Sequence, residues 1–154
     1  HATTAVSAPV LYSKSIMLDC ALNGTVVATV ATTPSSLVSL RQLASSAVDA
    51  GWPCIVVQPV EPMHLPDESD ARVIRLLSLP AEPILPRFTW CNGSSQQYWS
   101  RRGSFYRLLL WRRVLDQGFN VLGMDASRRI LKNPLPAIDA LRTRSAAQYG
   151  SGVA

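Results

Sequence analysis

The residues of this chain that could do chemistry are densest between positions 119 and 136. Asp125 follows a short apolar segment, residues 120–124, which predicts a buried β-strand. Ser127 comes two residues later, before a segment with two arginines and a lysine. Because strands of α/β proteins end at the crevice that holds charged ligands, we interpret Asp125 as a ligand-binding residue. The alternative is a structural role, in which Asp125 caps the turn after the strand.

Positive charge is concentrated around Asp125. The chain has 154 residues and a formal net charge of +5. Residues 1–99 carry 5 Lys or Arg against 7 Asp or Glu, whereas residues 100–154 carry 10 against 3. A basic segment of this kind suits a partner that bears phosphate, either a nucleotide or a nucleic acid. The other interpretation is that these arginines form a solvated helix face.

The amino-terminal half predicts a βαβ unit and therefore a parallel sheet. Residues 25–31, TVVATVA, are rich in β-branched side chains and uncharged, as expected of a strand buried on both faces. Residues 54–58, CIVVQ, predict a second buried strand. A helix that ends at Gly51 is predicted between the two strands. Its inward side chains are expected to be Leu37, Leu40, Ala44, Ala47 and Val48.

The carboxyl-terminal half must position Asp125. Residues 59–86 contain 6 prolines and predict an excursion over the sheet with a short helix at 69–78. A strong helix is predicted over 104–117, just before the strand that leads to Asp125. Its apolar face is expected to consist of Phe105, Leu108, Leu109, Trp111 and Leu115. Residues 137–147 predict a last helix, with Ile138 and Leu141 facing inward.

These patterns divide the chain into three parts. Residues 1–24 are a poorly patterned lead-in, residues 25–145 an α/β domain, and residues 146–154 a tail. No apolar run is long enough to span a membrane, and the amino end lacks a signal-peptide pattern. We therefore expect any targeting signal to lie outside this stretch.

The cysteines and the possible glycosylation sites bear on the compartment. Cys20, Cys54 and Cys91 lack the C-x-x-C spacing of a zinc site. They suit buried thiols, or one disulfide with a spare cysteine, and the sequence leaves their pairing open. Two Asn-x-Ser/Thr tripeptides, at Asn23 and Asn92, permit N-glycosylation if the chain is lumenal.

Several well-known catalytic motifs are missing from the sequence. There is no G-x-G-x-x-G, no Walker A loop and no G-x-S-x-G elbow. His64 lies between prolines with no partner for a catalytic triad. The acidic residues 67–70 are interpreted as a solvated turn with a helix cap.

The segment around Asp125 resembles the plant and algal nucleotide-diphospho-sugar transferase family, which includes arabinosyl- and xylosyltransferases of cell-wall glycans and glycoproteins. That family has a helix ending in Gly-Tyr, a strand, an acidic D-x-D motif and an apolar run. Arg or Lys, Asp or Asn, and Pro close the motif. Gly118-Phe119, Asp125 and Lys132-Asn133-Pro134 match this pattern without a gap. The resemblance is strong over residues 104–136 and weaker over the rest of 25–140.

The resemblance implies a fold, a substrate and a compartment. The fold would be a Rossmann-like, GT-A-type, mostly parallel sheet flanked by helices, incomplete in this chain. The donor would be a UDP-sugar, the acceptor a glycan or glycoprotein, and the compartment the Golgi or another part of the secretory-pathway lumen. No nucleic-acid partner is expected. Because the acceptor-binding half and the catalytic base of such enzymes usually lie further along, we expect this stretch alone to be inactive.

The resemblance also implies a metal site. The family's D-x-D holds Mn²⁺ or Mg²⁺, which bridges the diphosphate of the donor. Asp125 stands at the first acidic position and Ser127 at the second, so these are the expected metal ligands. Arg107, where the family often has a basic residue, is expected to bind the nucleotide sugar with Asp125. Thr32 and Thr33, after the first strand, complete this set.

Ser127 is a departure from the family pattern, because a neutral hydroxyl replaces a carboxylate. One reading is a weaker metal site made of Asp125, water and the substrate phosphates. A second reading is a non-catalytic pseudoenzyme that keeps the fold. The alternative from another class is a basic module that contacts nucleic acid through the arginine-bearing helix.

Overall fold

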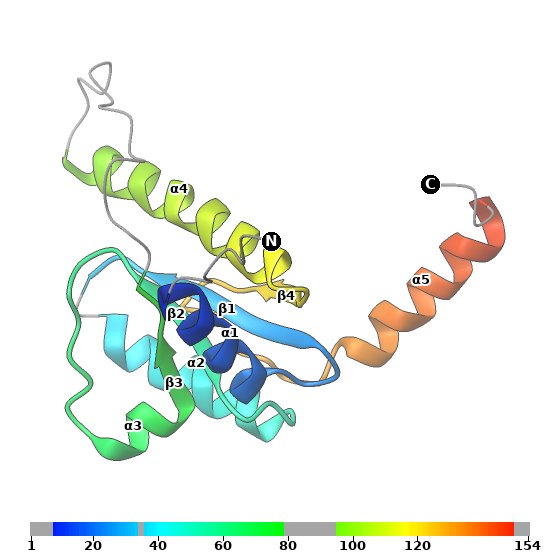
Figure 1. Cartoon of the computed structure of the whole chain (residues 1–154), viewed down its shortest axis with the longest axis horizontal. Coiled ribbons are helices and arrows are strands. Elements are labelled where there is room, and N and C mark those ends of the chain that lie inside the picture. The colour runs from blue at the N-terminus through cyan, green and yellow to red at the C-terminus, as the bar shows by residue number, and fades with distance from the viewer. Residues whose placement is uncertain (1–7, 34–35, 79–94, 150–154) are drawn as a thin grey trace, which may run out of the picture.

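A computed structural model describes residues 8–33, 36–78 and 95–149, with side chains placed for 12–33, 36–78 and 102–149. The chain forms a four-stranded sheet in the order β3-β2-β1-β4 (Figure 1). Every neighbouring pair is parallel, which confirms the predicted α/β, Rossmann-like architecture. The strands are β1 (Thr25–Ala31), β2 (Ile55–Pro59), β3 (Ile74–Leu76) and β4 (Asn120–Gly123).

Helices cover both faces of this sheet. Helix α2 packs on one face, whereas α1 and α4 pack on the other, so α2 and α4 lie on opposite sides (Figure 1). The short α3 leads directly into β3, and α5 follows the loop after β4. The helices are α1 (Ala8–Cys20), α2 (Leu37–Asp49), α3 (Glu68–Val73), α4 (Ser95–Asp116) and α5 (Leu135–Tyr149).

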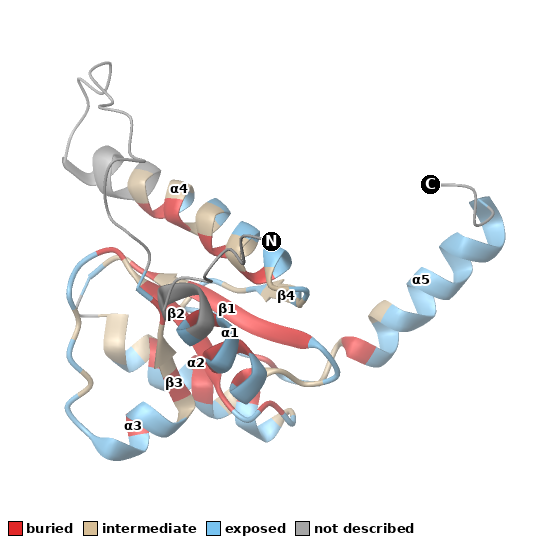
Figure 2. Ribbon diagram, viewed as in Figure 1, coloured by how far each residue is buried: buried red, intermediate tan, exposed pale blue. Residues whose placement is uncertain are grey.

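Strand β1 is the centre of the core. Its side chains alternate, as those of any strand must, between the two faces of the sheet. Val27 and Ala31 pack in the cluster that contains α2, whereas Val26 and Ala28 pack in the cluster that contains α1 and α4. Both sides of β1 are therefore buried, which Figure 2 shows as a red ribbon. This confirms the strand and explains why it carries no charge.

Helix α4 includes the predicted helix but begins at Ser95, before the predicted start at 104, and presents a different face to the sheet. The buried side chains are Tyr106, Leu110 and Val114, which recur every four residues. Leu108 and Leu115, predicted to face inward, are 61% and 54% exposed, so that prediction is wrong. The apolar residues of α4 lie on almost every side of the helix. Contact with β1 and β4 therefore decides which of them are buried.

Three other expectations from the sequence are wrong in part. The helix predicted over 69–78 ends at Val73, because Ile74–Leu76 instead forms β3 beside β2. Val48 at the end of α2 is exposed. Leu141 is exposed as well, because α5 leaves the body of the protein after its first turn (Figures 1 and 2).

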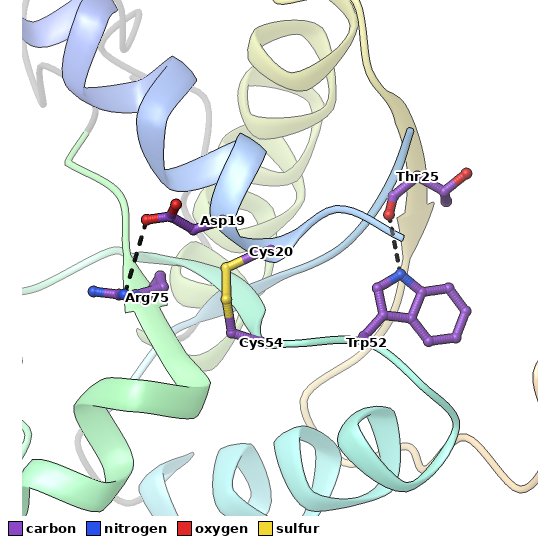
Figure 3. Close-up of a disulfide and its surroundings, with 6 residues drawn as sticks. All are labelled: Asp19, Cys20, Thr25, Trp52, Cys54 and Arg75. Carbon is purple, nitrogen blue, oxygen red and sulfur yellow. Dashed lines mark hydrogen bonds and ion pairs between the residues drawn. A yellow bond between two sulfur atoms is a disulfide. The ribbon is translucent and has the colours of Figure 1, made fainter. Parts of the chain in front are cut away.

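The lead-in segment forms α1 and is tied to the sheet by a disulfide. Ile16, Met17 and Cys20 are buried against β1 and β2. Cys20 is bonded to Cys54, just before β2, with 4.7 Å between their Cα atoms (Figure 3). Cys91, the third candidate for pairing, lies outside the described residues.

The aromatic segment from Arg87 to Ser100 is described only from residue 95 onward. Phe88 and Trp90 lie outside the described residues, as does the sequon at Asn92. Residues 95–100 form the first turns of α4. Within the described part of the chain, no helix combines the length and the apolar character needed to cross a membrane.

The two faces of α4 can be compared by substitution. We expect Leu110→Ala to lower the free energy of unfolding by about 2–5 kcal/mol, because a fully buried side chain leaves a cavity. Leu108→Ala, on the exposed side of the same helix, should change it by less than about 0.5 kcal/mol. Urea denaturation followed by circular dichroism measures both values. Equal losses would show that α4 is packed differently.

Candidate functional site

The order of the strands has a switch point, where successive strands are added on opposite sides of β1. From β1 the chain passes through α2 to β2 on one side, whereas β4 lies on the other side of β1 and is reached from α4 on the opposite face. In open α/β sheets, ligands bind in the crevice outside the carboxyl ends of the strands at such a switch point. In this chain the switch point lies between the carboxyl ends of β1 and β4, so a crevice for a ligand is expected there.

The register of these two strands places the predicted residues at this edge. Ala28 pairs with Gly123, and the amide of Met124 donates to the carbonyl of Ala28 at 3.0 Å. Thr32 and Asp125 therefore leave the sheet at the same edge, each just beyond its strand. β4 is an outer strand and only partly buried, so the prediction of a buried strand before Asp125 is wrong.

Helix α4 contacts both strand ends along one of its faces. A Cβ atom on Gly103 would lie 2.9 Å from Cγ2 of Thr32, so the helix backbone approaches the end of β1 closely. One turn later, Arg107 donates from Nη2 to Oδ1 of Asp125. The two helix positions are about 6 Å apart along the axis. Thr32 and the Arg107–Asp125 ion pair thus contact α4 at positions one helical turn apart.

The Arg107–Asp125 ion pair sets the charge of this edge. Both side chains are about half exposed, at 42% and 49%. The guanidinium neutralises the carboxylate and fixes its direction through a charge-assisted hydrogen bond. Arg128 and Arg129 follow in the next loop and are exposed. Arg129 lies beside α2, where it lines a pocket with Arg41 and Asp49.

Asp125 also begins a tight turn. Its backbone carbonyl accepts a hydrogen bond from the amide of Arg128 at 2.9 Å, while its carboxylate bonds to Arg107. It is therefore the main chain that closes the turn, and the alternative role of Asp125 as a side-chain cap is not what this geometry shows. Ser127 is exposed within the turn. Asp125 and Ser127 are thus not spaced along an extended strand.

The loop after Asp125 is held against α2. Ile130 is buried, and its amide donates to Oγ of Ser46 at 3.0 Å. Oγ of Ser46 in turn donates to the carbonyl of Leu43 at 2.8 Å. No local pattern indicates this contact, because Ser46 and Ile130 are 84 positions apart.

The Lys132-Asn133-Pro134 triplet has a structural role in this chain. Oδ1 of Asn133 accepts a hydrogen bond from the amide of Leu135 at 2.9 Å, where α5 begins. Leu135 is buried in the α2 face of the core. The triplet therefore starts α5 and fixes the far end of the loop that Asp125 opens.

Gly123 is a further residue that sequence reasoning missed. A Cβ atom at this position would lie 2.6 Å from the indole of Trp111. The ring of Trp111 therefore packs directly on the backbone of β4, which brings α4 and β4 close together two residues before Asp125. A glycine inside a short strand, with a tryptophan in the preceding helix, is the signal that could have indicated this close approach.

Thr32 and Thr33 lie where β1 gives way to α2. Thr32 is partly buried and Thr33 is exposed. The carbonyl of Thr33 accepts a hydrogen bond from the amide of Ser36 at 3.0 Å, just before α2 begins at Leu37. The amino end of α2 therefore faces the same edge as Asp125, and helix amino termini favour anions.

The donor atoms at this edge set limits on a metal site. Among the described residues, no group of three or more His, Cys, Asp or Glu side chains could hold a metal ion. Asp125 offers carboxylate oxygen and Ser127 a neutral hydroxyl. Mg²⁺ often binds through one or two carboxylates together with substrate phosphates and water. Because Asp125 is already paired with Arg107, the described residues do not form a metal site by themselves.

Comparisons of this chain with protein-family models, curated proteins and solved structures gave no match.

The ion pair at this edge can be removed without unfolding the protein. We expect Arg107→Ala and Asp125→Ala each to lower the free energy of unfolding by less than about 1 kcal/mol, because half-exposed ion pairs contribute little to stability. A double-mutant cycle measured by urea denaturation gives the coupling between the two residues. A coupling of several kcal/mol would contradict this exposed geometry.

Proposed function

We propose that this chain binds the diphosphate of a UDP-sugar between the carboxyl ends of β1 and β4. It would form the donor-binding part of a glycosyltransferase that passes the sugar to a glycan or glycoprotein acceptor. The observation that carries the proposal is that α4 contacts Thr32 through Gly103 and Asp125 through Arg107, one turn apart, beside the switch point of the sheet. The resemblance of residues 104–136 to nucleotide-diphospho-sugar transferases supports it.

Each residue at the crevice has a chemical part in this proposal. The guanidinium of Arg107 is suited to hold phosphate oxygens, because its planar donors match their geometry. The hydroxyls of Thr32 and Thr33 are neutral hydrogen-bonding groups for the phosphate or the ribose. The amino end of α2 adds a favourable field for the negative charge.

Mn²⁺ or Mg²⁺ is the proposed cofactor. Such a cation, when bound, neutralises the charge that develops on the diphosphate as the sugar leaves. Asp125 would supply the one carboxylate and Ser127 a hydroxyl. Because Arg107 already neutralises Asp125, we expect weak affinity for the cation alone and stronger affinity when UDP is present.

The proposed compartment is the Golgi or another part of the secretory-pathway lumen. The Cys20–Cys54 disulfide supports this location, because disulfides persist in oxidising compartments and are rare in the cytosol. Two sequons in the sequence agree with it.

Two alternatives remain as competing proposals. The neutral Ser127 favours a pseudoenzyme that binds a nucleotide sugar but does not transfer the sugar. Binding of nucleic acid through the arginines of α4 has less support from their contacts. Arg107 pairs with Asp125, Arg112 pairs with Asp116 at 3.6 Å, and Arg113 contacts the hydroxyl of Ser13 at 3.3 Å.

Binding of UDP in the presence of Mn²⁺ tests the proposed site. We expect Asp125→Ala and Arg107→Ala each to weaken binding about tenfold or more, because a hydrogen bond to a charged group contributes about 1.5–3 kcal/mol. Isothermal titration calorimetry measures the dissociation constants.

Arg112→Ala is the matched control for this experiment. Arg112 lies on the same helix, is exposed, and pairs with Asp116 away from Asp125. Its loss should leave UDP binding unchanged. The proposal fails if Asp125→Ala binds UDP as well as the parent chain. RNA binding that falls steeply with salt, without any response to UDP, would instead support the nucleic-acid alternative.

Ser127→Asp tests the second position of the motif. A second carboxylate should strengthen the dependence of UDP binding on Mn²⁺, because hard divalent cations prefer carboxylate oxygen. Ser127→Asn adds similar bulk without charge and is the control. Calorimetric titrations with Mn²⁺ and with a chelator measure the difference. Weaker binding by Ser127→Asp, with and without Mn²⁺, would remove Ser127 from the metal site.

A further inference from the structure

We propose that Asn23 is an N-glycosylation site, modified as the chain enters an oxidising lumen. Asn23-Gly24-Thr25 is an acceptor tripeptide for this modification. The inference rests on the proposed compartment but not on sugar transfer by this protein. Three features of the structure carry it: a disulfide beside the turn, the exposure of the turn, and its position far from the Asp125 crevice.

The disulfide points to the compartment in which this modification occurs. Cys20 and Cys54 are buried at the junction of α1 with β2, close to the turn that carries Asn23 (Figure 3). Stable disulfides form in the lumen of the endoplasmic reticulum, among other oxidising compartments. Attachment of glycans to Asn-x-Ser/Thr occurs on proteins that enter the same lumen.

The turn itself leaves Asn23 accessible. Leu22 and Thr25 exchange two backbone hydrogen bonds of 2.9 Å, so Asn23 and Gly24 are the two central residues of a tight turn. Both have positive φ, 49° and 73°, as a type I′ turn requires. Asn23 is exposed, and a Cβ atom on Gly24 would meet no other atom within 4 Å. Asn23 is therefore accessible from solvent, and it also lines a pocket with Asn120 and Arg142.

The position of the turn keeps a glycan away from the proposed binding site. Asn23 precedes the amino end of β1, whereas the Asp125 crevice lies at the carboxyl end. β1 has 7 residues, which corresponds to about 20 Å between the two edges of the sheet. A glycan on Asn23 would extend from the opposite edge and leave the crevice open.

The burial of Thr25 determines when the modification occurs. Thr25 is only 8% exposed, and its carbonyl accepts a hydrogen bond from the indole of Trp52 at 3.0 Å (Figure 3). An enzyme that reads the threonine of the tripeptide must therefore act before β1 joins the sheet. The donor would be an oligosaccharide linked to a lipid through a diphosphate.

The transfer forms one bond and breaks one bond. The amide nitrogen of Asn23 bonds to C1 of the first sugar, and the bond from C1 to the phosphate oxygen breaks. The lipid diphosphate leaves with the bonding electrons, and the amide proton passes to a base of the transferring enzyme. No oxidation or reduction takes place.

Expression of the whole chain in the secretory lumen of a eukaryotic cell tests this proposal. Treatment with peptide-N-glycosidase F in heavy-oxygen water should leave a labelled aspartate at position 23, found by mass spectrometry of the peptides. The label separates the removal of a glycan from spontaneous deamidation. The same peptide map reports position 92 independently.

Asn23→Gly and Asn92→Gln are the paired variants. Glycine suits positive φ, so Asn23→Gly should keep the turn. It should also abolish the decrease in electrophoretic mobility that a glycan at position 23 causes. Asn92→Gln should retain that decrease. Unlabelled Asn23 in the secreted protein with an intact disulfide overturns the proposal, whatever the result of UDP titrations. A glycan at Asn23 in a chain that does not bind UDP upholds it and removes only the nucleotide-sugar assignment.

Discussion

The burial of β1 on both faces is the constraint on which the rest of the structure depends. A strand with apolar side chains on both sides needs a helix layer on each side, because either face would otherwise be left in water. Helix α2 covers one face, and α1 with α4 covers the other. Since α2 follows β1 and α4 precedes β4, the chain must change direction between these two strands. The switch point beside Asp125 therefore follows from the placement of α2 and α4 on opposite faces of β1.

Local patterns in the sequence predict the parallel sheet but not its outer parts. TVVATVA and CIVVQ each have one plausible conformation, and the helix between them has a clear apolar stripe. Residues 69–78 do not, because Ile74 could continue a helix or pair with β2, and only the neighbouring strand decides. The inward face of α4 is ambiguous for the same reason: contact with the sheet, and not the order of residues, selects Tyr106 and Leu110.

The candidate site is likewise predictable from the sequence only in part. Asp125 stands out in the sequence because of its place after a strand, and Thr32 for the same reason. The bond between Arg107 and Asp125, the close approach of Gly103 to Thr32, and the contact of Ser46 with Ile130 depend on tertiary packing. These contacts join residues from different elements, and nothing in the local sequence encodes them. The neutral Ser127 is visible in the sequence, whereas its place in a turn is not.

The Cys20–Cys54 disulfide constrains one of the two strands beside the switch point, β1, and not the other, β4. The bond encloses β1 and α2 in one covalent loop and joins α1 to that loop, so this part of the chain has fewer unfolded conformations open to it. β4 is an outer strand of four residues outside the loop. The local unfolding that costs the least free energy should therefore begin at β4 and the Asp125 turn. The two strands beside the switch point are thus held differently: β1 lies within the covalent loop, whereas β4 and the Asp125 turn are held by noncovalent contacts such as the Arg107–Asp125 ion pair.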